Sequence, residues 1–207
     1  IEKALADESM KDDRVIGICD RDYSEEQAGR IFYCDKCCLE LMVISENEVW
    51  HKFCDLYYNG EEDYTSVLSG ILRQLAPVSM LRKENAQKNA GIEEIDFRKL
   101  KLGKYLDVHN IDICQAFTDC GWKGYYEHCL RLAANLTDEE LYEYTNGHDL
   151  CKILGMICEG GKGPLGEKKV RDILYKKYER RNFVKTDLYN DLKQYQNQES
   201  RTWKYVD

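Results

Sequence analysis

The sequence predicts an all-α protein: a single compact, disulfide-stabilised domain of roughly eight helices. Two observations favour this fold class, because apolar residues recur at helical spacing and helix-start signals recur along the chain. The chain has 207 residues, of which 43% are hydrophobic and 33% charged, so it can form one sizeable core. We expect one helical domain over residues 1–194, followed by a loosely attached tail over 195–207.

Three capping boxes predict where helices begin. They are Ser24-Glu25-Glu26-Gln27, Ser45-Glu46-Asn47-Glu48 and Thr137-Asp138-Glu139-Glu140. In each, a hydroxyl at the N-cap and a Glu or Gln three residues later can satisfy backbone N–H groups that lack a partner in the helix. We expect the first helix to end near Val43, the second near Gly60 and the third near Gly147.

Apolar stripes support these helices and predict others. The clearest stripes are Val49, Trp50, Phe53, Cys54 and Tyr57; Tyr64, Val67, Leu68, Ile71, Leu72 and Leu75; and Val170, Ile173, Leu174 and Tyr178. Residues three and four apart share one face of a helix, so each stripe predicts a helix with one buried face. Residues 91–110 carry no decisive pattern.

Ten cysteines are the strongest compositional signal. They are Cys19, Cys34, Cys37, Cys38, Cys54, Cys114, Cys120, Cys129, Cys151 and Cys158. Secreted proteins use cysteines in pairs as cross-links, whereas cytosolic proteins keep them reduced. Five lie at or before Cys54 and five at or after Cys114, so complete pairing needs at least one bridge between the two halves. We therefore treat all ten as disulfide candidates.

A zinc site is the alternative use of the first cysteines. Cys34, Cys37, His51 and Cys54 have an acceptable Cys3His spacing, and "CDKC" and "WHKFC" resemble pieces of PHD and LIM zinc fingers. Those families continue with further ligand pairs that this chain lacks, and the segment between the pairs carries helix signals. We favour structural cross-links, with Cys34 and Cys38 one turn apart on a helix.

Two cysteine spacings resemble those of the insect odorant-binding proteins. Cys34-x3-Cys38 in "CDKCC" is similar to their second-to-third spacing, and Cys120-x8-Cys129 in "CGWKGYYEHC" is similar to their fifth-to-sixth. The other spacings depart from that family. The resemblance implies a helical secreted protein that carries a small hydrophobic ligand.

A basic helix is predicted after residue 162. From Lys162 to Lys185 there are nine basic and three acidic residues, a net charge of +6, so the rest of the −8 chain carries −14. The candidate partner-binding residues are Lys168, Lys169, Arg171, Lys176, Lys177, Arg180 and Arg181. Such a helix suits an acidic or sulfated surface. The pI of about 5.2 and the lack of a known motif argue against nucleic acid.

Catalytic and membrane signals are weak in this chain. It has no HExxH or GxSxG motif and no run of about 18 apolar residues, so we expect no catalysis, no cofactor and no membrane span. The leading hypothesis is a secreted, extracellular protein that binds another protein, as an inhibitor or host-directed effector. The alternatives are a carrier of a small hydrophobic ligand and an intracellular zinc-binding adaptor.

Overall fold

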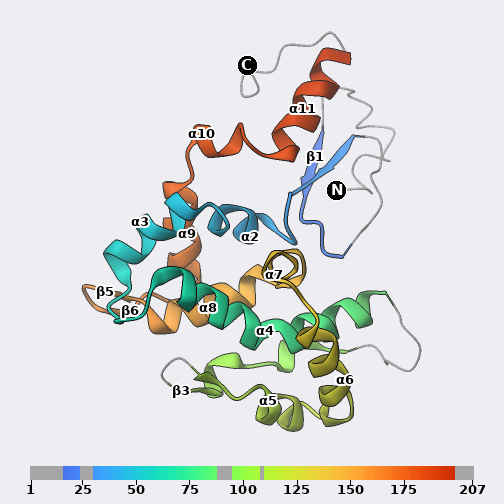
Figure 1. Cartoon of the computed structure of the whole chain (residues 1–207), viewed down its shortest axis with the longest axis vertical. Coiled ribbons are helices and arrows are strands. Elements are labelled where there is room, and N and C mark those ends of the chain that lie inside the picture. Colours follow the sequence, from blue (N-terminus) through green and yellow to red (C-terminus); the bar gives the residue numbers. More distant parts are fainter. Residues whose placement is uncertain (1–15, 24–29, 88–94, 108–109, 199–207) are drawn as a thin grey trace.

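The computed structural model describes residues 16–23, 30–87, 95–107 and 110–198. Helices dominate these residues, as the sequence predicts, and the strands form three small two-stranded ribbons (Figure 1). β1 and β2 are parallel, while β3–β4 and β5–β6 are antiparallel hairpins. Within the described residues, no helix has the length and apolar character that crossing a membrane requires.

In chain order, the described elements are β1 (Gly17–Cys19), β2 (Ile31–Tyr33), α2 (Leu39–Ile44), α3 (Asn47–Tyr57), α4 (Tyr64–Ala86), the 3-10 helices η2 (Phe97–Lys99) and η3 (Leu102–Lys104), β3 (Leu106–Asp107), β4 (Asn110–Ile111), α5 (Ile113–Asp119), α6 (Lys123–Ala134), α7 (Asp138–Tyr144), α8 (Gly147–Ile157), β5 (Glu159–Gly160), β6 (Gly163–Pro164), α9 (Glu167–Lys177), α10 (Arg180–Phe183) and α11 (Asp187–Gln198).

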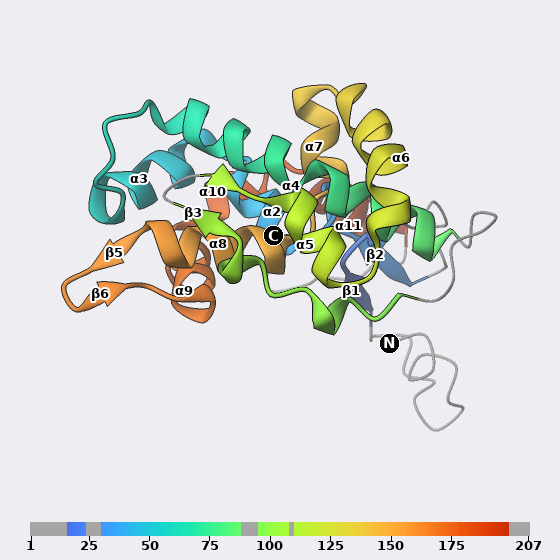
Figure 2. The same cartoon turned by 90° about the horizontal axis from the view of Figure 1, so that it is seen from below.

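The long helix α4 organises the main core. It contacts α3, α5, α6, α7 and α8, and Figure 2 shows it running across the molecule with these helices around it. Trp50, Phe53, Leu72, Phe117 and Leu150 are among the largest side chains that are fully buried in this core. Burying such side chains contributes most of the free energy that stabilises a helical domain.

The three predicted stripes are confirmed as buried faces. On α3 the buried side chains are Val49, Trp50, Phe53 and Cys54; on α4 they include Val67, Leu68, Ile71, Leu72 and Leu75; on α9 they are Val170, Ile173 and Leu174. The last residues of two stripes, Tyr57 and Tyr178, are only partly buried and pack against the same cluster. Helical spacing in the sequence therefore identified which faces form the core.

The predicted helix that runs to Val43 is wrong over its middle. Ile31–Tyr33 is strand β2, paired in parallel with Gly17–Cys19, and the helix begins only at Leu39. The β-branched and aromatic sequence "IFY" suits a strand once a partner is available. That partner comes from a separate segment, so a local pattern could not reveal it. The capping box over residues 24–27 lies outside the described residues.

The other two boxes have different outcomes. Thr137 and Glu140 form the predicted reciprocal capping box at the start of α7. Ser45 does not cap α3, because its backbone N–H closes α2 and its hydroxyl donates to the Met42 carbonyl at 3.0 Å. The α3 helix nevertheless starts two residues after Ser45 and ends three residues before Gly60, close to the predicted bounds, since packing of its apolar face stabilises it.

The C-terminal helix α11 forms a second, smaller cluster with the first strands. Leu188, Tyr189 and Leu192 pack with Cys34 and Met42. The Asp35 carboxylate accepts hydrogen bonds from the backbone N–H groups of Asp187 and Leu188, each at 2.8 Å. The helix continues to Gln198, so residues 195–198 of the predicted loose tail are helical, and 199–207 lie outside the described residues.

Candidate functional site

The predicted basic residues lie on two successive helices, α9 and α10. Helix α9 buries Val170, Ile173 and Leu174 and contacts α2, α3 and α8. Because the opposite side of the helix is not covered, Lys168, Lys169 and Lys176 are exposed. The segment then turns at Tyr178 into the short α10, which begins at Arg180 (Figure 1).

Two of the seven predicted residues have internal partners. The Arg171 guanidinium lies 3.6 Å from Glu40 Oε1 and 3.8 Å from Glu167 Oε1. Arg181 forms a close ion pair with Glu48, and its Nε lies 2.9 Å from Glu179 Oε2. These arginines attach α9 and α10 to α2 and α3, so their charges are already balanced within the fold.

The other five residues define what we call the basic surface: Lys168, Lys169, Lys176, Lys177 and Arg180. Within the described part of the chain, none of their side chains forms an ion pair or a hydrogen bond. Lys169 and Lys176 are seven residues apart, which places them on the same side of α9 two turns apart. Tyr175 and Val184, each 37% exposed, add apolar area to the same segment.

A buried carboxylate holds α9 beneath this surface. Glu40, 5% exposed, accepts a hydrogen bond from the Tyr175 hydroxyl at 2.8 Å and faces the Arg171 guanidinium. Burial raises the pKa of the Glu40 carboxyl, but the hydrogen bonds it accepts, chiefly from Tyr175, outweigh burial and hold the pKa below its ordinary value. Burial and the same hydrogen bond raise the pKa of Tyr175.

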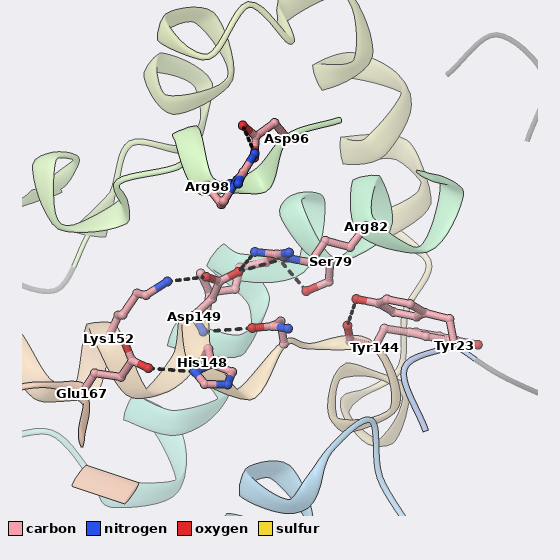
Figure 3. A network of polar contacts seen from close by, with 12 residues as sticks. Tyr23, Ser79, Arg82, Asp96, Arg98, Tyr144, His148, Asp149, Lys152 and Glu167 are labelled. Atoms are coloured by element: carbon pink, nitrogen blue, oxygen red, sulfur yellow. Dashed lines mark hydrogen bonds and ion pairs between the residues drawn. The ribbon is translucent and has the colours of Figure 1, made fainter. Parts of the chain in front are cut away.

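A second polar network joins α4, α8 and α9 (Figure 3). Arg82 donates to Asp149 Oδ2 from Nε at 3.1 Å and from Nη2 at 2.7 Å, and Lys152 Nζ lies 3.4 Å from Asp149 Oδ1. His148 Nδ1 lies 2.7 Å from Glu167 Oε1 in the first turn of α9. The Arg82–Asp149 pair joins α4 to α8, and the His148–Glu167 contact joins α8 to α9, the helix that carries most of the basic surface.

The buried thiols are not built as nucleophiles. Burial raises the pKa of five of them to about 12, and these are Cys34, Cys37, Cys129, Cys151 and Cys158. A reactive cysteine needs the opposite shift, since the thiolate is the attacking species. These five thiols therefore remain protonated near neutral pH and pack as small apolar groups.

The alternative zinc set of Cys34, Cys37, His51 and Cys54 is not assembled. Cys34 lies in the small cluster beside α11, whereas Cys54 lies in the main core. His51 is exposed, and its ring packs edge-on against Tyr64 with centroids 5.6 Å apart. Across the ranges that the structure describes, no group of three His, Cys, Asp or Glu residues could hold a metal ion.

All ten predicted disulfide cysteines are free thiols in the structure. Seven are buried, Cys19 and Cys120 are partly buried, and Cys114 is exposed. The expected helical arrangement of Cys34 and Cys38 is wrong, because both precede α2 and Cys38 is its N-cap residue. The sulfur of Cys38 instead packs against Gly147 at the start of α8.

Two surface hollows bear on the carrier hypothesis. One, of about 140 Å³, lies along α4 between Glu62 and Gln74, and the other, of about 280 Å³, lies among α4, α5 and α6 beside Tyr126. Both are lined by polar as well as apolar groups and are smaller than typical pockets for a hydrophobic ligand. Neither hollow supports the hypothesis that the protein carries a small hydrophobic ligand.

Some of the site was not found from the sequence. Local sequence patterns do not identify Glu40, Arg82 and Asp149, because each has an ion-pair partner far away along the chain. The one available signal was Glu40 itself, a carboxylate inside the apolar run "CLELMVI". No protein-family model, curated protein or solved structure matches the chain, so function rests on the geometry described above.

Proposed function

We propose that this chain is a secreted helical binding protein that engages an acidic surface of another extracellular protein through its basic surface. The observation that supports the proposal is a separation of charge within one segment. Arg171 and Arg181 have carboxylate partners, whereas the five residues of the basic surface have none in the described part of the chain. Clustered like charges repel one another, so an external partner that supplies carboxylates would relieve that repulsion.

The rest of the same segment favours a protein as the partner. Tyr175 and Val184 are exposed in the same segment as Arg180, and aromatic side chains and arginine are enriched at protein interfaces. A sulfated glycan would use the cations alone. Helix α9 is held by the Tyr175–Glu40 hydrogen bond and by the His148–Glu167 contact, so it would bind with little loss of conformational freedom.

The test is to neutralise the basic surface and leave the two internally paired arginines intact. The variant carries Lys168→Gln, Lys169→Gln, Lys176→Gln, Lys177→Gln and Arg180→Gln. A matched control neutralises five exposed basic residues elsewhere, Lys99, Lys101, Lys104, Lys123 and Arg131, none of which has an ion pair among the described residues. Both variants should unfold within about 2 °C of the parent, since surface substitutions change stability little.

Binding would be measured against a panel of purified extracellular domains and against heparin, at two salt concentrations. We expect saturable binding to an acidic domain that weakens at least about tenfold in the basic-surface variant and stays unchanged in the control. Equal losses in the two variants would show nonspecific charge attraction. Binding to heparin alone would replace the protein partner with a sulfated glycan, and undiminished binding by the first variant would refute the proposal.

A further inference from the structure

The turn between α6 and α7 carries the single N-glycosylation sequon of the sequence. The sequon is Asn135-Leu136-Thr137, in which a residue other than proline separates the asparagine from the threonine. No other asparagine of the sequence is followed two residues later by Ser or Thr. An asparagine that accepts a glycan has to lie in a surface segment, because the oligosaccharide is bulky and strongly hydrated.

The structure meets this requirement. Asn135 is the C-cap residue of α6, and Thr137 is the N-cap residue of α7, so the sequon is the connection between two helices. Both residues are exposed, and Leu136 between them is only partly buried. The side chain of Asp138, the next residue, is 69% exposed. An oligosaccharide on Asn135 would therefore extend into solvent without displacing side chains of the core.

The Asn135 amide can lose one hydrogen and still keep its contact in the fold. Its Nδ2 donates a hydrogen bond to the Arg131 carbonyl at 3.1 Å, and this is its one side-chain hydrogen bond among the described residues. A side-chain amide nitrogen carries two hydrogens, so one can stay on the Arg131 carbonyl after a sugar has replaced the other. The end of α6 is thus compatible with the modified residue.

The sequon is separate from the basic surface. Helix α6 packs mainly on α4 and α5, whereas α9 packs on α8, α3 and α2. In both views α6 lies on the right of the molecule and α9 on the left (Figures 1 and 2). A glycan at the end of α6 would therefore leave α9 accessible to a partner.

We propose that Asn135 is N-glycosylated when the chain passes through the secretory pathway, an inference that rests on the secreted location in the proposed function. The donor is an oligosaccharide linked to a polyprenyl diphosphate. Nδ2 of Asn135 attacks the anomeric carbon of the first sugar, and a carbon–nitrogen bond forms as the bond from that carbon to the diphosphate oxygen breaks. The polyprenyl diphosphate leaves, and the amide proton passes to a base of the oligosaccharyltransferase, so the step is a substitution without oxidation or reduction.

The Thr137 hydroxyl has two uses, which follow one another in time. The sequon requires a hydroxyl at this position, two residues after the asparagine. In the folded protein the same hydroxyl accepts a hydrogen bond from the Glu140 backbone N–H at 3.2 Å and donates to Glu140 Oε2 at 3.0 Å. The transfer therefore takes place before this capping box closes, and the box then forms beside the modified asparagine.

The experiment produces the full chain behind a cleavable signal peptide in cultured eukaryotic cells and recovers it from medium and lysate. Tryptic peptides are treated with peptide-N-glycosidase in heavy-oxygen water, which converts a glycosylated asparagine to labelled aspartate, and are sequenced by mass spectrometry. A digest without the glycosidase corrects for unaided deamidation, to which the Asn146-Gly147 sequence in the same peptide is prone.

We expect glycosidase-dependent label at Asn135 and a single gel-mobility shift of the intact chain that the enzyme removes. Unlabelled Asn135 in chains that have lost the signal peptide would overturn the proposal, since those chains have entered the secretory pathway. No binding partner is needed, so this failure is distinct from failure of the proposed function.

Variants separate the sequon from the helix ends. Asn135→Gln and Thr137→Ala should each abolish the mobility shift, whereas Thr137→Ser should keep it, because serine supplies both the hydroxyl of the sequon and a helix N-cap. Asn190→Gln is the matched control, since it changes an exposed asparagine of α11 outside any sequon and should leave the shift in place. A shift that persists in Asn135→Gln would contradict the proposal.

Discussion

Arg82 and Asp149 form an ion pair between α4 and α8, although they lie 67 residues apart in the chain. Two guanidinium nitrogens of Arg82 approach the same carboxylate oxygen, at 3.1 and 2.7 Å, and the Arg82 guanidinium also lies 4.2 Å from the centre of the Phe97 ring. The side chains are only 17% and 4% exposed. If either side chain is removed, the other charge stays largely buried without a partner of opposite charge, which is unfavourable.

Removing one member of this pair should therefore destabilise the protein strongly. We expect Arg82→Met to lower the free energy of unfolding by about 3 kcal/mol, because it leaves the Asp149 carboxylate buried beside Lys152 alone. The double variant Arg82→Met/Asp149→Leu should cost less than the sum of its two single variants. The measurement is urea-induced unfolding followed by circular dichroism.

Arg73→Met provides the control from the same helix. Arg73 also pairs with an aspartate, Asp138, but the two side chains are 47% and 69% exposed. Exposed ion pairs contribute little, so we expect a loss below about 1 kcal/mol. If the two substitutions cost the same, burial of the Arg82–Asp149 pair would not be what makes it important.

Stability should depend on the protonation of Glu40 in acid. The folded-state pKa of Glu40 is depressed, so its contribution is fully present above the ordinary pKa of about 4.5 and disappears as the pH falls through the folded value. We expect the parent to exceed Glu40→Gln by about 2 kcal/mol at pH 7 and by much less at pH 3. Other carboxylates titrate equally in both proteins and cancel in this difference.

Tyr175→Phe tests the cause of that pKa shift. Without the hydroxyl, the Glu40 carboxyl loses the strongest of the hydrogen bonds that lower its pKa. Its acid transition should therefore move to higher pH than in the parent, as measured from unfolding free energies at several pH values between 3 and 7. A difference between the parent and Glu40→Gln that stays constant over this range would show that Glu40 does not titrate as described.

The contact between α8 and α9 should tolerate no side chain at residue 155. A Cβ atom there would lie 2.5 Å from the Gly166 carbonyl carbon and 2.7 Å from the Glu167 nitrogen, so the backbone of α9 would have to move. We expect Gly155→Ala to cost about 1–3 kcal/mol, measured by thermal unfolding. Gly70→Ala on α4 is the control, because open space surrounds that position and alanine should stabilise the helix by roughly 0.5–1 kcal/mol. Similar effects of both changes would refute the close approach.

Much of the helical architecture could be predicted because its causes are local. The spacing of Val49, Trp50 and Phe53 defines a buried face whatever covers it, and the Thr137 box closes with Glu140 only three residues away. The order of the cations on α9 is likewise a property of the sequence. Such features depend on contacts within one or two turns, which a linear pattern records.

Other features depended on the tertiary structure, because their partners lie far apart in the chain. Ile31–Tyr33 becomes a strand only beside Gly17–Cys19, and Ser45 is unavailable to α3 because it already closes α2. Sequence charge alone grouped Arg171 and Arg181 with the lysines, whereas the fold places Glu40 and Glu48 against them. Composition and spacing thus determined that this is a helical chain with a basic segment. Packing decided which of those charges remain available to a partner, since only the folded chain brings the opposing carboxylates within reach.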